Sequence, residues 1–423
     1  MRAPGRAIVP VVTLAALVCV TGCGSGGGGH HGTTAAPTAT PRASATPIQP
    51  TPTAMSSNVQ PIAVDLGPTG DYTNGLFTSV TICMPGDDSR CQTIGGVLVD
   101  TGSVGLRILS SALSLSLPQQ TTASGDPAAE CVPFLDSLTW GSVRVADVEL
   151  AGETASAIPI QVIGDPRFPN IPARCTSSGL PPADTVGTLR TNGILGVGVF
   201  REDCGPICES NGAENPGVYY ACPASGCEQI AQPIASQLQN PVWKLPEDND
   251  GVVIELPSIP ASGSDGVSGS LILGIGTRSN NGLGAANIVT LSANGTFTTL
   301  FESQSVTVSF IDSGSNGIFF LNTAQTGIPT CTGGNKGFYC PPSPQTISTT
   351  LRGARGETVS ATFTAANANA LFDGNPNAVA FDDLAGPSPG IFDFGLSFFY
   401  GRRVFAAIEG QTTPAGAGPY VAY

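Results

Sequence analysis

The chain from residue 58 onward is a succession of short runs in which apolar and polar residues alternate. Examples are "GLFTSVTIC", "SVRVADVELAG", "GVVIELP" and "SVTVSFID", each bounded by Gly, Pro, Asn or Asp. A two-residue period places every second side chain on one buried face, which is typical of a β-strand. The pattern therefore predicts an all-β fold with few short helices.

Two segments interrupt this pattern. Residues 228–239, "EQIAQPIASQLQ", are the one helical candidate, and Pro233 is expected to kink or shorten the helix. Residues 246–251, "PEDNDG", lack the spaced ligands of a calcium loop and are interpreted as a solvated turn. Neither segment changes the all-β prediction.

The length of the chain predicts more than one compact unit. Its 423 residues exceed what a single hydrophobic core usually fills. We expect two β-rich lobes, residues 58–260 with a cysteine-rich insertion at 204–227, and residues 261–423. Two lobes leave room for a cleft between them.

The first residues predict export. Arg2 and Arg6 precede an apolar stretch, residues 7–20, that is too short to span a bilayer. The stretch leads into Val20-Thr21-Gly22-Cys23, which resembles the lipobox of bacterial lipoproteins. Residues 1–23 are therefore predicted to be a lipoprotein signal peptide with Cys23 as the lipidated residue; secretion with cleavage nearby is the alternative.

The segment after Cys23 indicates which bacterial membrane the lipid anchor would occupy. Gly24 is not the aspartate that the lipoprotein resemblance associates with inner-membrane retention, which favours the outer membrane. Residues 24–57 are rich in Gly, Thr, Ala, Pro and Ser and hold one charged residue, Arg42, so they are expected to be a disordered tether. Membrane contact is then expected only through the lipid.

The charge balance excludes some partners. The net charge is −14, only 11% of the residues are charged, and no basic run occurs. Nucleic acid and anionic membrane surfaces are poor partners for such a surface. We expect a monomer that binds neither.

Cysteines predict disulfides. Of the twelve, Cys19 lies in the signal and Cys23 would carry the lipid, and the even number that remains is typical of an exported disulfide protein. Close spacing suggests the pairs Cys83–Cys91 and Cys331–Cys340, which leaves Cys131–Cys175 as a longer bridge. Four cysteines allow three pairings that spacing does not separate, with a zinc site as the less favoured alternative: Cys204, Cys208, Cys222 and Cys227.

Histidine usage narrows the chemistry further. The only histidines are His30 and His31, both in the predicted tether. The folded region therefore has no Ser-His-Asp or Cys-His pair and no histidine-ligated metal. We expect no metal and no cofactor, and carboxylates remain as the candidates for proton transfer.

One short stretch has a second copy. "VLVDTGSVGLRIL", residues 97–109, aligns with "SFIDSGSNGIFFL", residues 309–321, so that Asp100 corresponds to Asp312. Each aspartate follows an apolar strand and precedes a hydroxyl residue, a glycine and a serine. A single Asp-Thr-Gly arises readily by chance, whereas the shared flanking pattern indicates an internal repeat.

The paired motifs resemble those of the pepsin-like aspartic proteases. The resemblance implies two lobes related by a pseudo-twofold axis, each contributing one catalytic aspartate, Asp100 and Asp312. "NGILGVG", residues 192–198, resembles the family element that passes behind the first aspartate's loop, and residues 392–408 resemble the closing element of the second lobe. In the latter, Asp393 departs from the two apolar residues that the family has before the glycine.

Residues around each aspartate fit the same resemblance. Glycine permits the tight turn that brings the loops together. The hydroxyls can lock one loop to the other or hydrogen-bond the carboxylates. The supporting residues of the pair are Thr101, Gly102, Ser103, Ser313, Gly314 and Ser315.

The hairpin that covers the cleft in the pepsin-like family, called the flap, has a different residue at its key position in this sequence. Residues 134–152 have the spacing of the hairpin that covers the family's cleft with a tyrosine, so Phe134 would take the tyrosine's place and Trp140 would lie on the same hairpin. The phenolic hydroxyl is then missing. Arg107 also stands where the family often has an aromatic residue supporting the flap, and both changes are interpreted as altered rate or specificity.

These features lead to one functional hypothesis and two alternatives. Two carboxylates about 3 Å apart share a proton, so one can deprotonate a water while the other protonates a carbonyl. The hypothesis is a membrane-tethered endopeptidase acting on peptide or protein substrates. The alternatives are an inactive module that binds peptide or glycan and a structural envelope lipoprotein. Lipobox, tether and cysteine-rich insertion together also resemble a family of proteobacterial exported proteins of unassigned function.

Overall fold

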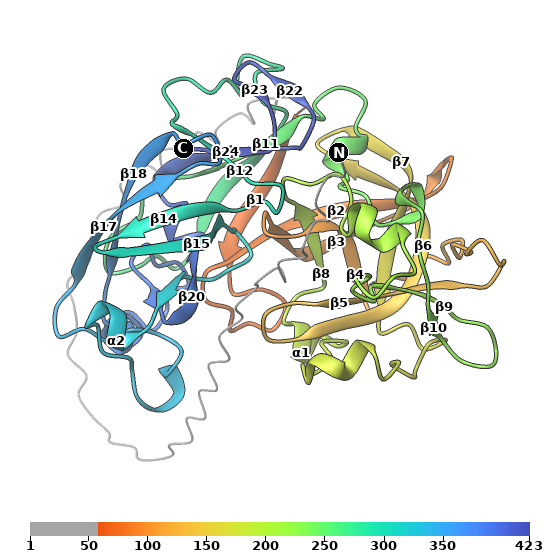
Figure 1. Cartoon of the computed structure of the whole chain (residues 1–423), viewed down its shortest axis with the longest axis horizontal. Coiled ribbons are helices and arrows are strands. Elements are labelled where there is room, and N and C mark those ends of the chain that lie inside the picture. Colours follow the sequence, from red (N-terminus) through yellow and green to blue (C-terminus); the bar gives the residue numbers. More distant parts are fainter. Residues whose placement is uncertain (1–57) are drawn as a thin grey trace, which may run out of the picture.

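A computed structural model describes residues 58–423. The predicted signal peptide (1–23), its Cys23 and the tether (24–57) lie outside the described residues. Strands dominate the described chain, which confirms the all-β prediction (Figure 1). No helix among these residues is long and apolar enough to cross a membrane. The helices are α1 (Val186–Leu189), α2 (Thr323–Thr326) and α3 (Ala368–Gly374), with single-turn 3₁₀ helices η1 (Cys175–Ser178), η2 (Gly205–Glu209), η3 (Ile234–Ser236), η4 (Val242–Lys244), η5 (Gly333–Asn335) and η6 (Leu396–Phe398).

The larger sheet has 15 strands in the order β10-β9-β5-β6-β7-β4-β8-β3-β2-β1-β12-β11-β21-β24-β13. Almost every central strand is apolar on at least one face, as the alternation predicted. The strands are β1 (Val59–Asp65), β2 (Gly75–Met84), β3 (Asp87–Asp100), β4 (Val104–Leu109), β5 (Ala128–Pro133), β6 (Leu138–Leu150), β7 (Glu153–Ile163), β8 (Gly193–Val197), β9 (Tyr219–Ala221), β10 (Glu228–Gln229), β11 (Gly251–Leu256), β12 (Val267–Leu273), β13 (Ile288–Thr290), β21 (Arg402–Ala407) and β24 (Tyr420–Ala422).

The smaller sheet has 7 strands in the order β18-β17-β14-β15-β20-β16-β19. A separate two-stranded hairpin lies near the chain end. The strands are β14 (Phe297–Phe301), β15 (Gln304–Ile311), β16 (Ile318–Leu321), β17 (Gln345–Arg352), β18 (Thr358–Ala365), β19 (Ala385–Gly386) and β20 (Ser388–Phe394), with the hairpin β22 (Thr412–Thr413) and β23 (Gly416–Ala417).

Strands from both ends of the described chain meet in the larger sheet. β1 pairs with β12, and β24 pairs with β21. In Figure 1, β14, β15, β17, β18 and β20 lie on one side of the picture, β2 to β7 on the other, and β1, β11, β12 and β24 between them. β11 and β12 flank the expected lobe boundary at residue 260 and pair with each other. The division into residues 58–260 and 261–423 stays a prediction.

The two aspartate motifs lie in the same arrangement of strands. β8 runs parallel to β3, with Gly196 opposite Asp100, and antiparallel to β4. β20 runs parallel to β15, with Phe394 opposite Ile311, and antiparallel to β16. In both places a strand from later in the chain lies between the two strands that flank an aspartate loop. The sequence repeat is therefore also a repeat of strand pairing.

Aromatic packing fixes one face of β20. Phe392 and Phe394 stack with ring centroids 4.7 Å apart, and Phe392 also stacks on Phe320 at 5.0 Å. Successive side chains of a strand point to opposite faces. Asp393 therefore points away from this aromatic cluster.

The helix prediction for residues 228–239 is wrong. The segment forms only the two-residue β10 and the 3₁₀ turn η3. Pro233 lacks an N–H and disfavours helical backbone at the residue before it. Gln237 instead binds the insertion: its Nε2 donates to the Gly205 carbonyl at 2.9 Å, and its Oε1 accepts from the Gly205 N–H at 2.6 Å.

The interpretation of residues 246–251 as a solvated turn is also wrong. Asp248 is only 1% exposed, and Asp250 is buried beside it. Thr277 Oγ1 donates to Asp248 Oδ1 at 2.5 Å, and Arg278 Nε donates to Asp248 Oδ2 at 2.6 Å. The polar turn carries buried carboxylates because these distant donors fold onto it.

The described cysteines are all disulfide-bonded, and the three predicted pairs are confirmed. The remaining four pair locally, so their sulfurs are not thiolate ligands for zinc. The bonds are Cys83–Cys91, Cys131–Cys175, Cys204–Cys208, Cys222–Cys227 and Cys331–Cys340.

Candidate active site

Asp100 and Asp312 occupy equivalent loops, and both side chains are fully buried. Asp100 ends β3, and Asp312 follows β15 directly. The N–H two residues later donates to the Oδ1 of each aspartate at 2.8 Å: Gly102 to Asp100 and Gly314 to Asp312. Each carboxylate is thus held by its own tight turn.

A serine three residues after each aspartate completes its support. Ser103 Oγ donates to Asp100 Oδ2 at 2.5 Å, and Ser315 Oγ donates to Asp312 Oδ2 at 3.0 Å. Hydrogen bonds to ionised carboxylates are among the stronger ones in proteins. The two copies therefore hold both oxygens of each carboxylate in the same way.

The two loops also bind each other reciprocally. The Thr101 N–H donates to Ser313 Oγ at 3.1 Å, and the Ser313 N–H donates to Thr101 Oγ1 at 3.0 Å. Each hydroxyl then donates across the pair to a carbonyl of the strand before the other aspartate: Thr101 to Ile311 at 3.2 Å and Ser313 to Val99 at 2.8 Å. Segments far apart in the sequence are locked together at this point.

Glycines make the close approach of the carboxyl groups possible. A Cβ placed on Gly102 would lie 2.7 Å from Asp312 Cγ, and one placed on Gly314 would lie 2.7 Å from Asp100 Oδ1. A real Cβ does not come this close to another heavy atom. Each glycine is therefore in contact with the opposite aspartate.

Burial and negative neighbours favour a proton on Asp312. Its pKa is raised well above the usual range by burial, then by the charges of Asp100 and Asp393, and by a hydrogen bond shared with Asp100, against the opposing bond from Gly314. A carboxyl pair in hydrogen-bonding contact keeps one proton because two adjacent charges repel. The pair can thus hold one acid and one base together.

The hairpin of β5 and β6 carries Phe134 at its tip. The Phe134 N–H donates to the Ser137 carbonyl at 2.8 Å, which closes the turn. Phe134 is buried and lines a pocket of about 1130 Å³ that is open to solvent and also lined by Leu98, two residues before Asp100. The residue expected at the flap position thus lies on a hairpin beside the strand of the first aspartate.

Trp140 lies on the same hairpin but contacts the cysteine-rich part of the chain. Its Nε1 donates to the Phe168 carbonyl at 2.9 Å, and its ring meets Tyr220 edge-on at 5.3 Å. Cys131 and Cys175 belong to the same buried cluster. Trp140 is not among the residues that line the Phe134 pocket.

Tyr72 was missed by sequence reasoning. It is buried, lines the Phe134 pocket and packs edge-on against Phe77 at 5.3 Å. Burial raises the pKa of its phenol, Arg190 opposes that rise, and the charges of Asp100 and Asp312 add to it. A phenol near both aspartates is therefore present on another element. In the sequence, the only indication of this site residue was a single tyrosine between two turn residues.

Arg190 supplies the positive charge of this pocket. Its guanidinium lies over the Tyr72 ring, 5.1 Å from the centroid, and donates to Asp71 Oδ1 and to the Asp71 carbonyl at 2.8 Å. It is one of the pocket-lining residues. The pocket therefore combines apolar walls with one buried cation.

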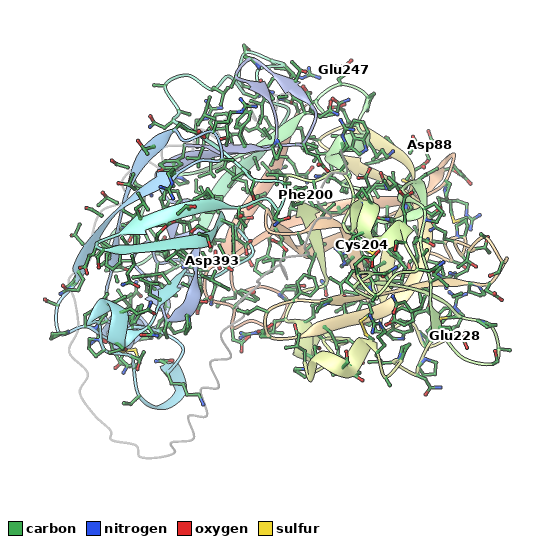
Figure 2. All side chains as sticks on the ribbon, viewed as in Figure 1. Asp88, Phe200, Cys204, Glu228, Glu247 and Asp393 are labelled. Atoms are coloured by element: carbon green, nitrogen blue, oxygen red, sulfur yellow. A yellow bond between two sulfur atoms is a disulfide. The ribbon has the colours of Figure 1, made fainter. Side chains whose placement is uncertain are left out.

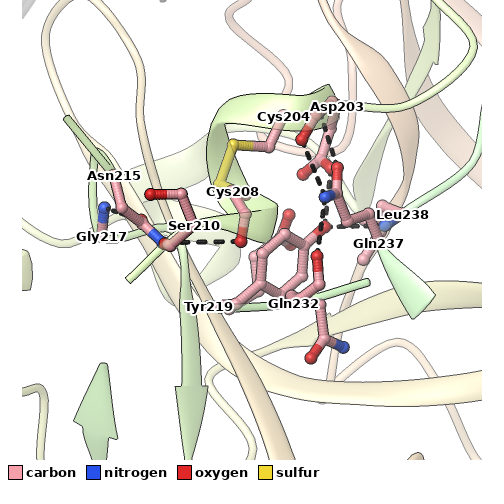
Figure 3. The surroundings of a disulfide bond; sticks show 12 residues. Asp203, Cys204, Cys208, Ser210, Asn215, Gly217, Tyr219, Gln232, Gln237 and Leu238 are labelled. Carbon is pink, nitrogen blue, oxygen red and sulfur yellow. Dashed lines mark hydrogen bonds between the residues drawn. A yellow bond between two sulfur atoms is a disulfide. The ribbon is translucent and has the colours of Figure 1, made fainter. Parts of the chain in front are cut away.

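Arg107 takes part in a buried ionic network instead of aromatic packing. Its guanidinium lies 3.0 Å from Glu130 Oε1 and 3.2 Å from Asp203 Oδ2. Tyr219 donates to Asp203 Oδ1 at 2.6 Å and accepts from the Leu238 N–H at 2.7 Å, close to the Cys204–Cys208 disulfide (Figure 3). The network joins β4, which follows Asp100, to the hairpin strand β5 and to the cysteine-rich insertion.

A second pocket adjoins the aspartate loops. Its volume is about 670 Å³, and its lining includes Thr101, Gly102 and Ile311, with Phe200 (Figure 2) and Phe310. Its walls are mainly apolar. This pocket places open space beside the first aspartate loop and the end of the strand that leads to the second.

One group of three potential metal-ligand residues occurs in the described range: Cys83, Cys91 and Glu149. The two cysteines form a disulfide, so their sulfurs are not thiolate ligands. Metal-binding thiolates must be free to deprotonate. This group therefore gives no support for a metal centre.

The structure is thus that of a disulfide-bonded β protein in which a repeated strand arrangement joins two aspartate loops. Residues 54–423 match a family described as "Protein of unknown function (DUF3443)". Because the match covers most of the chain, the protein belongs to this family. The search of curated proteins gave no significant match.

Proposed function

We propose that this protein is a pepsin-like aspartic endopeptidase of the bacterial envelope. The observation that carries the proposal is the reciprocal contact of the Asp100 and Asp312 loops, in which each glycine touches the opposite aspartate. Few structural needs require two buried carboxyl groups held against each other's loops, because such burial is costly. Sharing a proton between the two carboxyl groups is a chemical function that accounts for their burial.

The reaction follows from the protonation state of the pair. The ionised carboxyl group takes a proton from a water, whose oxygen attacks the peptide carbonyl, and the protonated group donates to the carbonyl oxygen. Collapse of the tetrahedral intermediate breaks the C–N bond, with a proton passing to the leaving nitrogen. One acid and one base suffice for this sequence, so histidine is not needed.

The Phe134 pocket is the proposed site for a substrate side chain. Leu98, Phe134 and Tyr72 form apolar or aromatic walls, which favours an apolar residue next to the cleaved bond. Both aspartates are fully buried, so a peptide must displace what covers them. Movement of the hairpin tip at Phe134 is the proposed opening, since a lid on a hairpin is a common way to exclude water.

The test is cleavage of a diverse peptide library by the purified protein between pH 3 and 7. We expect cleavage that falls by at least about 10³-fold in Asp100→Asn and in Asp312→Asn, because each variant removes a proton-transfer group. Asp383→Asn serves as the control, since Asp383 is a buried carboxyl outside the pair. Failure of the folded wild-type protein to cleave any peptide contradicts the proposal.

Full burial of both aspartates favours a second candidate, an inactive module that holds a peptide or glycan. In that case Asp100→Asn leaves ligand affinity largely unchanged while no variant or wild-type protein turns ligand over. The proposed setting is common to both functions: a monomer tethered to the outer membrane through Cys23. Metabolic labelling with a fatty acid, lost in Cys23→Ala, tests that anchor. A purely structural lipoprotein would show neither turnover nor ligand binding.

A further inference from the structure

Asn74 is a buried amide from the start of the described chain whose side-chain partners all lie far along the sequence. It lies between β1 and β2, is 1% exposed, and the nearest of these partners is 242 residues away. Its Nδ2 donates to the carbonyls of Asn316 and Phe381, each at 2.8 Å, and to Ser397 Oγ at 3.2 Å. Its Oδ1 accepts from the Phe381 N–H at 2.7 Å and from the Tyr400 hydroxyl at 3.0 Å. Both ends of the amide are therefore hydrogen-bonded.

Backbone and side chain both favour asparagine at this position. Asn74 has a φ of +51°, a left-handed conformation that asparagine adopts more readily than most residues. Its amide presents two N–H donors beside one acceptor oxygen. Aspartate has the same shape but would place an oxygen against the carbonyls of Asn316 and Phe381. Glycine would suit the backbone but would make none of the side-chain hydrogen bonds.

One of the partners belongs to the second aspartate loop. Asn316 lies four residues after Asp312, and its carbonyl accepts from Asn74. At the other end of the same loop, Ser313 exchanges hydrogen bonds with Thr101. The loop that carries the second aspartate is therefore held at both ends by residues from the first part of the chain.

Comparison with the first loop shows why a distant donor is needed. Val104 is the counterpart of Asn316 in the sequence repeat, and its carbonyl accepts from Arg107 Nη1 at 2.7 Å, three residues further on. The counterpart of Arg107 in the second copy is Phe319, whose side chain has no donor. Asn74 supplies the hydrogen bond that the second loop cannot obtain locally.

The turn that carries Asn74 also forms one wall of the Phe134 pocket. Tyr72, two residues earlier, lines that pocket and packs edge-on against Phe77. The turn is tight, since a Cβ placed on Gly75 would lie 2.6 Å from Tyr72 Cδ1. In Figure 1, β2, which follows this turn, lies on one side of the picture, and β15, which leads to Asp312, lies on the other. Asn74 therefore connects a wall of the pocket to the second aspartate loop.

We propose that Asn74 is a positioning residue whose amide fixes the Asp312 loop relative to the Tyr72 wall of the Phe134 pocket. Its meaning for catalysis rests on the proposed function: a substrate side chain in the pocket is then held at a set distance from the second aspartate. The amide binds one aspartate loop only. Its removal loosens the Asp312 loop and leaves the Asp100 loop in place.

Hydrogen exchange of two equivalent amides, followed by NMR, tests this without enzymatic activity. The Gly314 N–H donates to Asp312 as the Gly102 N–H donates to Asp100. Asn74→Gly keeps the left-handed backbone and removes the side chain. We expect the exchange rate of Gly314, relative to that of Gly102, to rise at least about fivefold, the equivalent of one hydrogen bond. General destabilisation would accelerate both amides equally, so an unchanged ratio overturns the proposal.

Three further variants show which side of the amide matters. Asn74→Asp keeps the acceptor oxygen and removes the donor to Asn316, so it should raise the ratio as Asn74→Gly does. Tyr400→Phe removes one bond on the acceptor side and should change the ratio by less than about twofold. Asn281→Ala is the matched control, because Asn281 is a fully buried asparagine whose side-chain partners lie within eight residues of it. A rise in Asn281→Ala as large as in Asn74→Gly overturns the proposal.

The wild-type protein provides a test that does not depend on the folding of any variant. In low concentrations of urea, the N–H of Phe381, which donates to Asn74 Oδ1, should exchange through the same opening as the N–H of Gly314. The N–H of Gly102 should exchange through a different opening. Separate openings for Phe381 and Gly314, or one opening shared by all three amides, overturn the proposal.

Peptide cleavage gives the catalytic readout. For a peptide with an apolar residue next to the cleaved bond, kcat should fall at least about tenfold in Asn74→Gly, and KM should change by less than about threefold. The pocket itself remains, and only its placement relative to Asp312 is lost. Asn281→Ala should keep both constants. A loss confined to KM overturns the positioning role.

The two proposals fail in different ways. If no form cleaves peptides while the exchange ratio rises as stated, the endopeptidase proposal fails and the placement of the Asp312 loop by Asn74 stands. If the wild-type protein cleaves peptides and the ratio is the same in Asn74→Gly, the endopeptidase proposal stands and the role of Asn74 is refuted.

Discussion

Tyr72 illustrates at the residue scale how a site can include a side chain that no motif contains. The sequence identified Asp100, Asp312 and their supporting hydroxyls because a repeat makes them conspicuous. Tyr72 stands alone between turn residues, and only the folding of β1 and β2 against the Phe134 pocket brings it near the pair. Asp393 was visible as a departure from the family pattern, but only the structure shows that its side chain is fully buried.

The phenol of Tyr72 is expected to assist cleavage. Tyr72→Phe removes only the hydroxyl and keeps the packing against Phe77, so the free energy of unfolding should change by less than about 1 kcal/mol. Loss of one hydrogen bond in the transition state should lower kcat/KM about tenfold. Denaturant unfolding and peptide cleavage measure the two effects. Equal kcat/KM in wild type and variant would show that the hydroxyl has no part in the reaction.

At the scale of elements, the strands were predictable and the insertion was not. Alternation of apolar and polar residues identifies β2, β6, β11 and β15 because one face of each is buried. The segment after Cys204 takes its form from side-chain bonds to backbone, such as those between Gln237 and Gly205, which carry no periodic signal. The Arg107 network that joins β4, β5 and this insertion likewise depends on contacts distant in sequence.

Glu130 on β5 should make stability depend on pH. Burial raises its pKa well above the usual range, although Arg107 lowers it. Because the folded state holds this proton more tightly, the stabilisation is complete below about pH 4.3 and is lost as pH rises through the raised pKa. In Glu130→Gln this pH dependence disappears. The stability of the variant relative to wild type should therefore increase as pH rises above about 4.3.

Urea unfolding at a series of pH values measures this difference. Glu228→Gln is the matched control, because Glu228 is exposed on β10 (Figure 2). Parallel pH profiles for wild type and Glu130→Gln would show that Glu130 has the same pKa in the folded and unfolded chain.

On the scale of the whole molecule, length and composition predicted a large, disulfide-bonded β protein but not how its sheets connect. The ends of the described chain, β1 and β24, join the sheet that also holds β3 and Asp100, while Asp312 follows a strand of the smaller sheet. Such pairings between distant strands depend on the complete fold. Two disulfides could be predicted because short spacing limits the choices, and Cys131–Cys175 then remained as a longer bridge. The pairs within 204–227 could not be predicted.

The Cys131–Cys175 bond is expected to matter most among the predicted pairs. It closes a loop of 44 residues, against 8 for Cys83–Cys91. Loop entropy gives about 4 kcal/mol for the first bond and about 2.5 kcal/mol for the second. The double variant Cys131→Ala/Cys175→Ala should therefore lose more stability than Cys83→Ala/Cys91→Ala in chemical unfolding. It should also weaken cleavage, since Cys131 lies on the Phe134 hairpin. The reverse order of stability would contradict this ranking.

The reciprocal packing of Gly102 on Asp312 and Gly314 on Asp100 has a consequence for biosynthesis. A chain made from its N-terminus completes the first aspartate loop long before the second exists, and a lone carboxyl group cannot act as both acid and base. The growing polypeptide therefore lacks the carboxyl pair until the second loop has formed. In the proposed function, peptide hydrolysis begins only after the last strands have folded and the two aspartate loops are in contact. Folding of the complete chain therefore controls when the activity appears.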